Sequence, residues 1–220
     1  MAAGLLIAAA VVARAGWCLA GELIRGRRGR REHAALVAAA GRPDHELGVV
    51  VLDHGAPAVY CLPCGRYRMV VSAGALAALK PGQMRAVLAH ERAHLRCRHH
   101  LMLAAGAALG CAFSRVPLLA QARAGLGVLA EMAADDMATH RHDPGELAEA
   151  LVILARAGVH ATALAAGGPA AIARIQRLLA PPQQRRHRCA KLAAAAGLLL
   201  PAAVAGLPLI VTACDVVPHV

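Results

Sequence analysis

Long apolar stretches lie at both ends of the chain. Residues 1–24 are apolar apart from Arg14 and Glu22, and residues 192–213 contain no charge before a short tail over 214–220. About 20 consecutive apolar residues are enough to cross the hydrocarbon core of a bilayer. We therefore predict one transmembrane helix in each stretch. A cleaved signal peptide is the competing interpretation of the first.

Short valine-rich runs follow the first apolar stretch, over residues 47–52, 58–62 and 67–72. Turn-forming residues separate these runs, namely Asp53-His-Gly55 and Pro63-Cys-Gly65. Branched residues bounded by such turns are typical of strands. The pattern predicts a small antiparallel sheet.

Helix-forming residues dominate from Ser72 onward, and Pro81 suits the first turn of a helix that runs to about His99. Further helices are predicted over residues 119–141, 144–157 and 169–180. The expected fold is therefore mainly α, with an α+β domain over residues 47–191 that contains the small sheet and is flanked by transmembrane helices.

Basic residues border both apolar stretches on the side that faces the middle of the chain. Residues 25–46 form a basic linker or helix, and the second stretch is preceded by Arg185, Arg186, Arg188 and Lys191. Positive charges favour the cytoplasmic side of a membrane. We therefore expect a multi-pass protein of the plasma membrane, with the lipid bilayer as a partner and the central region in the cytoplasm.

Composition narrows the classes of function. The net charge is +11, but only 2% of the residues are aromatic, whereas proteins that bind single strands or RNA offer aromatic rings for base stacking. We therefore expect no direct nucleic-acid binding. The seven scattered cysteines favour reduced thiols. Cys61 and Cys64 have the spacing of a redox or zinc pair, but no second pair completes a four-ligand site, so we interpret them as a strand end and turn.

The chemistry of the chain concentrates in His90-Glu91-Arg92-Ala93-His94. On a helix, His90 and His94 project from the same face one turn apart, so both imidazoles can hold one zinc ion. Glu91 is then placed to take a proton from the attacking water and pass it to the departing amine. The apolar neighbours of the motif make solvated surface residues the weaker interpretation.

A catalytic zinc ion needs a third protein ligand and one open position. Glu131 is the best candidate, because it lies in a helical pattern with few other polar residues. Asp135 is one turn further along the same face, where it can accept the free ring N–H of a motif histidine. Asp136 points elsewhere and is interpreted as a surface residue.

Four other histidines compete for the third position. His99 and His100 turn away from the face of the motif, so we interpret them as interfacial polar residues at the start of an apolar helix. His140 and His142 lie at a helix end, where positive charge interacts favourably with the helix dipole. Capping is the expected role of that second pair.

The apolar stretch over residues 101–122 constrains the topology. A single crossing of the membrane by this stretch would put Glu131 on the opposite side from His90. If both residues bind one zinc ion, the stretch must return to the same face, lie in the interface, or be buried in the protein. We therefore expect an active site close to the bilayer surface.

Two separated segments resemble the BlaR/MecR-type membrane metallopeptidases. They are Val87-Leu-Ala-His-Glu-Arg-Ala-His-Leu-Arg-Cys-Arg-His-His100 and Glu131-Met-Ala-Ala-Asp-Asp136, and HtpX-type peptidases are more distant relatives with the same pairing of motifs. The resemblance runs from about Leu47 to the last helix and includes Arg174-Ile-Gln-Arg-Leu-Leu179. It implies zinc ligands at His90, His94 and Glu131, a catalytic Glu91, a supporting carboxylate at Asp135, and Arg174 as an oxyanion stabiliser.

The resemblance also implies a protein or peptide substrate. Members of the family inactivate a winged-helix repressor by cleavage in response to an outside signal. This chain departs from the pattern, because no extracellular sensor follows the last helix and one membrane helix replaces the several that usually precede the catalytic domain. We therefore expect a chain shortened at its start, and we infer no β-lactam sensing.

The leading hypothesis is a membrane-associated zinc endopeptidase. The alternative is a non-proteolytic signalling protein that uses the same fold to bind a partner, and activity separates the two because binding alone would not require Glu91. A haem or metal transporter would need polar residues within its spanning segments, and residues 192–213 have almost none.

Overall fold

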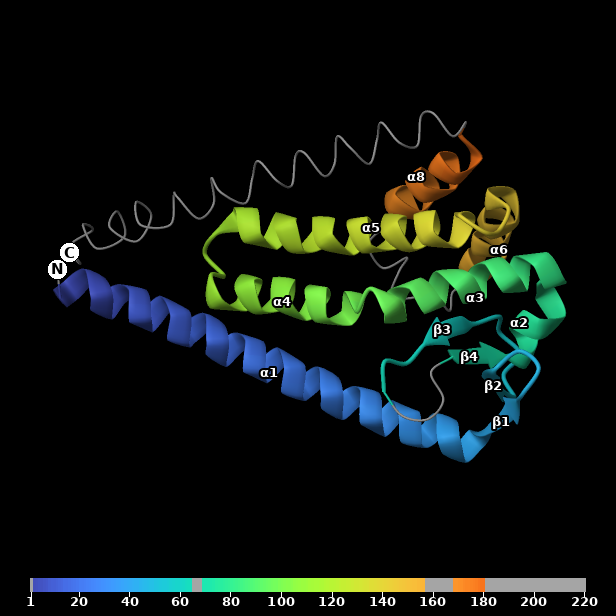
Figure 1. Cartoon of the computed structure of the whole chain (residues 1–220), viewed down its shortest axis with the longest axis horizontal. Helices are drawn as coiled ribbons and strands as arrows, with labels where there is room; N and C mark the ends of the chain where they lie inside the picture. Colours follow the sequence, from blue (N-terminus) through green and yellow to red (C-terminus); the bar gives the residue numbers. More distant parts are fainter. Residues whose placement is uncertain (1, 65–68, 157–167, 181–220) are drawn as a thin grey trace. The chain divides into compact units, whose positions relative to one another are not determined.

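The computed structural model in Figure 1 describes residues 2–64, 69–156 and 168–180. The helix predicted over 192–213 and the tail over 214–220 lie outside these ranges. The described part of the chain is mostly helical and contains one small sheet, as the sequence predicts. Its elements up to Leu178 belong to one compact unit.

The first element is a single long helix, α1 (Ala2–Ala40). It runs through the predicted membrane segment and most of the basic linker, because no proline interrupts the alanine-rich sequence before Pro43. The helix ends before Gly41, where any side chain would collide with Val50. Among the described residues, α1 is the one helix long and apolar enough to span a membrane.

The sheet is mixed rather than purely antiparallel. Its strands β1 (Gly41–Asp44), β2 (Val49–Leu52), β3 (Val59–Cys61) and β4 (Met69–Ser72) are arranged in the order β1-β2-β4-β3. The central pair, β2 and β4, is parallel, with Val50 opposite Val70, and the outer two pairs are antiparallel. The prediction of a purely antiparallel sheet is therefore wrong. After β2 the chain passes to β3 at the edge of the sheet, and β4 then lies between β3 and β2.

Both faces of the two central strands are covered. Val50 and Val70 pack with Val37 of α1 on one face, whereas Val51 and Val71 belong to a larger core on the other. Continuous valine runs are typical of strands that are buried on both faces. The pattern thus identifies the strands but carries no information on their relative direction.

Six helices follow the sheet in the described part of the chain: α2 (Ala73–Ala78), α3 (Pro81–Arg96), α4 (His99–Ala112), α5 (Pro117–Thr139), α6 (Pro144–Arg156) and α8 (Gly168–Leu179). The Ser72 side chain caps α2 by accepting a hydrogen bond from the Ala75 amide. The predicted helix from Pro81 to His99 is broken at Arg98, whose left-handed backbone (φ 51°) starts α4 in a new direction.

The apolar stretch over residues 101–122 forms most of a helical hairpin. The chain leaves α3 along α4, turns, and comes back along α5, which packs against both α4 and α3 (Figure 1). This return brings Glu131 beside His90. The requirement that the stretch turn back, on which a shared metal site depends, is therefore met.

Candidate metal centre

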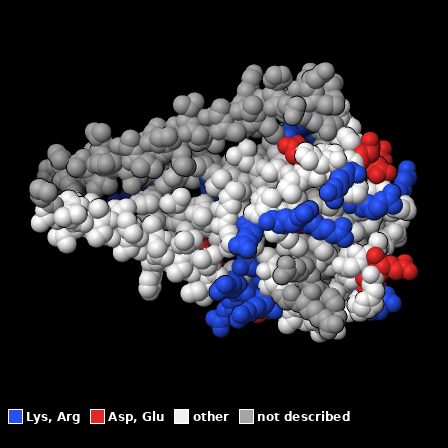
Figure 2. Space-filling model, in the orientation of Figure 1, with Lys and Arg blue, Asp and Glu red and all other residues white. Residues whose placement is uncertain are grey.

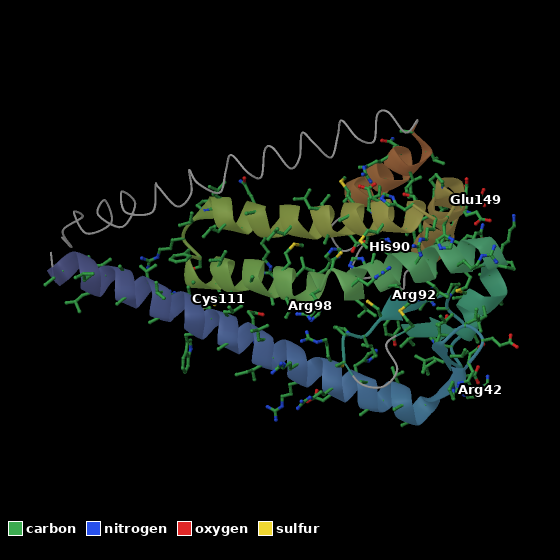
Figure 3. All side chains as sticks on the ribbon, in the orientation of Figure 1. Arg42, His90, Arg92, Arg98, Cys111 and Glu149 are labelled. Atoms are coloured by element: carbon green, nitrogen blue, oxygen red, sulfur yellow. The ribbon has the colours of Figure 1, made fainter. Side chains whose placement is uncertain are left out.

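The middle of α3 carries the two motif histidines toward α5, where Figure 3 labels His90 between the two helices. His90 is buried, and its Nε2 atom lies 3.1 Å from Nε2 of His94. The rings meet because a spacing of four residues is close to one helical turn. Val87 and Leu88 of the same helix are part of the core, so the histidine pair stands on a rigid element.

Glu131 of α5 completes a triangle of ligand atoms. Its Oε2 atom lies 3.4 Å from His90 Nε2, and its Oε1 atom lies 3.5 Å from His94 Nε2. In a tetrahedral zinc site with metal–ligand bonds of about 2.0–2.1 Å, neighbouring ligand atoms are about 3.4 Å apart. The donor set and its spacing therefore fit one zinc ion held by His90, His94 and Glu131.

Asp135 lies one turn further along α5 and is fully buried. Its Oδ1 atom is 3.0 Å from Nδ1 of His90, the ring nitrogen opposite the one that faces Glu131. Metal-binding histidines usually share their second ring nitrogen with a carboxylate, which fixes the orientation of the ring. The structure therefore brings the Asp135 carboxylate to this second ring nitrogen of His90.

Arg174 of α8 joins the two carboxylates. Its Nε and Nη2 atoms each donate a 2.8 Å hydrogen bond to Asp135, and its Nη1 atom lies 2.8 Å from Oε2 of Glu131. The sequence-based expectation for Arg174 is an oxyanion stabiliser, and the side chain does line the same cavity. All three of its nitrogens face carboxylates, however, and this geometry is that of a residue that positions Glu131 and Asp135.

His99 is the site residue that the sequence interpretation missed. It is buried at the start of α4, and its Nδ1 atom lies 2.9 Å from Nδ1 of His94. The interpretation of His99 as interfacial extrapolated one helix through Arg98, whereas the break there turns the ring back toward the motif. His94 thus has Glu131 at one ring nitrogen and His99 at the other.

The remaining candidate residues lie outside the triangle. His100 lines the cavity, whereas His140 follows the last turn of α5 and lies with His142 at a separate pocket. Cys61 and Cys64 are free thiols, and Cys64 donates a hydrogen bond to the backbone carbonyl of Arg30. Neither cysteine belongs to the group of possible metal ligands found among the described residues.

Asp136 is not a solitary surface residue, although it is partly exposed. Its carboxylate pairs with Arg177 of α8. Together with the contact between Arg174 and Asp135, this pair attaches α8 to the part of α5 that carries the site. Asp135 and Asp136 of α5 therefore each pair with an arginine of α8.

Glu91 follows His90 on α3 and is almost completely buried. Burial raises its pKa, while the positive charge of His90 and the thiol of Cys61 act in the opposite direction. A carboxylate with a raised pKa binds a proton more readily than an ordinary glutamate does, which suits general acid–base chemistry near neutral pH.

The ionisation states of the other site residues follow from burial and from their partners. Burial lowers the pKa of His94 to about 4, so this ring is neutral. Burial also opposes a proton on His90, but hydrogen bonds to Asp135 and Glu131 prevail and raise its pKa to about 9. Burial works against ionisation of Asp135, yet the hydrogen bond from Arg174 lowers its pKa to about 2. The Asp135 carboxylate is thus ionised.

A cavity of about 580 Å³ opens onto the site. One wall is β3, an edge strand of the sheet, with the residues that flank it over 58–63, and the other is α3 with Glu91. Arg30 and His33 of α1 also line the cavity, and His33 Nε2 lies 2.9 Å from the Tyr60 hydroxyl. Every residue of β3 thus lines the cavity.

Two imidazoles and a carboxylate at zinc-ligand spacing, with a buried glutamate beside them, are typical of metal-dependent hydrolases. The comparison with known families agrees. The sequence model of Peptidase family M48 matches residues 25–181, and the chain belongs to this family. No curated protein and no solved structure matches the chain.

Proposed function

We propose that the protein is a zinc-dependent endopeptidase that acts at a membrane. The observation that carries the proposal is the triangle of His90, His94 and Glu131, whose edges of 3.1, 3.4 and 3.5 Å match a tetrahedral zinc site. Membership in a peptidase family supports hydrolysis of peptide bonds as the reaction. The long apolar helix α1 supports membrane association.

The proposed mechanism divides the work between a metal ion and Glu91. When bound, zinc acts as a Lewis acid that activates water and polarises a carbonyl. Glu91 accepts a proton from the attacking water and delivers it to the departing amine. Its burial supports this role, because a raised pKa makes the carboxylate a better proton acceptor.

The surrounding residues keep the ligands in place. Asp135 orients His90 from the far side of its ring, and His99 does the same for His94. Arg174 holds Asp135 and Glu131 together. The geometry favours this positioning role for Arg174; direct stabilisation of an oxyanion stays a prediction.

The edge strand β3 is the proposed binding surface for the peptide. Among the described strands it pairs only with β4, and its residues line the cavity. An extended peptide can add to such an edge through backbone hydrogen bonds that are independent of side chains. The scissile bond would then lie between β3 and the ligands on α3.

The resemblance to BlaR/MecR-type peptidases suggests the biological substrate. We propose a winged-helix repressor as the target and a signalling role for the cleavage. The basic residues beside the apolar stretches support a multi-pass arrangement with the catalytic region in the cytoplasm.

Replacement of Glu91 by Gln tests the chemistry. The full-length protein in detergent should bind one equivalent of zinc as before, because Glu91 is not in the ligand triangle, while cleavage of casein should fall by about 100-fold or more. Glu46→Gln, at an exposed glutamate, is the matched control and should keep full activity. Undiminished cleavage by Glu91→Gln would exclude the mechanism.

The same experiment separates the non-proteolytic alternative. A partner-binding protein would bind zinc and show no cleavage in the unchanged chain either. Equal, background-level cleavage by the zinc-loaded protein and by Glu91→Gln would therefore support a binding role instead of catalysis.

A further inference from the structure

Residues 14–18 of α1 lie beside the end of α4, which packs along α5. The outer surface of these three helices is apolar. Trp17 is 84% exposed, and exposed leucines lie on all three helices, among them Leu5, Leu109 and Leu118. α4 itself contains no Asp, Glu, Lys or Arg. An exposed apolar surface of this extent is typical of a binding surface.

Arginines mark one limit of the apolar surface. Figure 2 shows a largely white surface over the N-terminal half of α1, with Lys and Arg gathered beyond it. On α1 they occupy residues 25–31, and Arg96 and Arg98 lie at the junction of α3 and α4, where the hairpin begins. We refer to these residues as the arginine collar. A positive collar next to an apolar surface matches the phosphate groups and acyl chains of a bilayer.

Two contacts show how far along α1 the hairpin reaches. Arg14 Nε donates a 2.7 Å hydrogen bond to the backbone carbonyl of Ala112, the last residue of α4. The Sγ atoms of Cys18 and Cys111 are 3.2 Å apart. The tip of the hairpin is therefore level with residues 14–18 of α1.

The distance along α1 from the arginine collar to the tip of the hairpin is about half the thickness of the hydrocarbon core. The eleven residues from Arg14 to Arg25 rise by ~16 Å at about 1.5 Å per residue, and the hydrocarbon core of a bilayer is ~30 Å thick. A hairpin that begins at the collar and ends near Arg14 enters one leaflet and stops near the midplane.

The contact at Arg14 also removes an objection to a membrane location of α1. An unpaired arginine in the apolar core is costly. Here the guanidinium meets the carboxyl-terminal end of α4, where free carbonyl groups carry partial negative charge. Arg115 and Arg123 of the hairpin are exposed. Arg115 follows the last residue of α4 by three positions, where the helix dipole favours positive charge. The long side chain of Arg123 can extend toward polar groups while its stem stays apolar.

We propose that the α4–α5 hairpin is a re-entrant segment that inserts halfway into the bilayer against α1, with the arginine collar on the lipid phosphates. The inference rests on the membrane location proposed for α1 and adds a second segment in the same leaflet. It places His94 and His99, at the base of the hairpin, at the membrane surface. A substrate would therefore be cut where it emerges from, or lies on, that surface.

Quenching of tryptophan fluorescence by lipids brominated in the middle of their acyl chains tests the inference. Trp17 is the only tryptophan and reports on α1. In a Trp17→Phe background, Leu109→Trp reports on the hairpin and Leu76→Trp on α2, at leucines that are 43% and 38% exposed. In vesicles of phosphatidylcholine and phosphatidylglycerol, we expect Leu109→Trp to be quenched as strongly as Trp17, and Leu76→Trp not to be quenched.

The two tryptophan positions test separate claims, one about α1 and one about the hairpin. An unquenched Trp17 would contradict the membrane location of α1. A quenched Trp17 with an unquenched Leu109→Trp would overturn the hairpin inference alone and indicate another occupant, such as a second copy of the chain.

Labelling of cysteines distinguishes a half-inserted hairpin from a full crossing. In sealed vesicles, a membrane-impermeant maleimide should label Cys97 at the collar from one side. It should label Ser114→Cys at the tip, in a chain without other cysteines, from neither side until SDS dissolves the membrane. Labelling of the tip from the side opposite to Cys97 would show a crossing, and labelling from the same side would show a hairpin in water. Either result would overturn the proposal.

Discussion

His90 and His94 are presented to a metal ion by residues on the far side of their rings. Asp135 faces one ring at 3.0 Å and His99 faces the other at 2.9 Å. The hydrogen bond between two Nδ1 atoms requires that one ring donate and the other accept. If His94 donates, its Nε2 atom keeps a free lone pair directed at Glu131, which is what a ligand needs.

Replacement of His99 by Ala should weaken zinc binding by about 10- to 100-fold, because His94 loses the partner that fixes its ring. His99→Gln keeps an acceptor group, so its affinity for zinc should lie between those of the unchanged chain and of His99→Ala. The measurement is competition for zinc against a chelator of known affinity. His100→Ala serves as the control at the neighbouring position, and an affinity of His99→Ala equal to that of the control would contradict the assignment.

Arg174 is expected to matter for folding as well as for the site. Arg174→Met would leave Asp135 buried beside Glu131 without the guanidinium that bridges them, at a cost of about 3–5 kcal/mol in the free energy of unfolding. Arg174→Lys keeps the charge but not the two-pronged geometry, so its loss should be smaller. Chemical denaturation in detergent measures both, with the exposed Arg156→Met as control. Equal stabilities of Arg174→Met and Arg156→Met would show that the contact is not stabilising.

The elements around the site are joined by short, specific connections. The left-handed Arg98 separates α3 from α4 within two residues, and this break directs His99 back to His94. At the end of β4, Ser72 caps α2 and also binds the loop before β3 through Ala56 and Ala58. The loop and β3, which forms one wall of the cavity, are thus tied to the start of α2.

Gly74 provides a test of that junction. Its amide donates to His54, and a Cβ at this position would overlap the backbone of Gly55. Gly74→Ala should therefore lower the free energy of unfolding by about 1–3 kcal/mol, because backbone atoms cannot move aside as a flexible side chain would. Gly55→Ala, which meets no atom within 4 Å, is the control. Similar denaturation midpoints for the two variants would refute the close packing.

Over the whole molecule, a metal ion would connect elements that are distant in the sequence. His90 and His94 lie on α3 and Glu131 on α5, and Arg174 adds α8 through its contacts with Glu131 and Asp135. A ligand that binds only the folded state stabilises it in proportion to its affinity and concentration. Zinc should therefore stabilise the folded state as well as support catalysis.

At zinc concentrations about 100 times the dissociation constant, the gain is about 2.7 kcal/mol, which corresponds to a rise in Tm of about 5–10 °C for a chain of this size. Glu91→Gln should show the same rise, because it keeps every ligand, whereas Glu131→Gln should show little. Thermal unfolding of the detergent-solubilised protein with zinc and after chelation measures these shifts. A rise in Glu131→Gln equal to that of the unchanged chain would remove Glu131 from the ligand set.

Local patterns in the chain determined much of this protein. The spacing of His90 and His94 placed both on one helical face, the valine runs located the strands, and the apolar run with its arginines identified α1 as a membrane candidate, because helical and strand periodicity act over a few residues. Tertiary structure alone decided the direction of β2 against β4, the path of the hairpin that returns Glu131 to His90, the partnership of His99 with His94, and the contacts of Arg174 with two carboxylates. These features depend on where distant segments meet or on a single backbone break at Arg98. The periodicity of a short stretch of sequence contains no information on either of these.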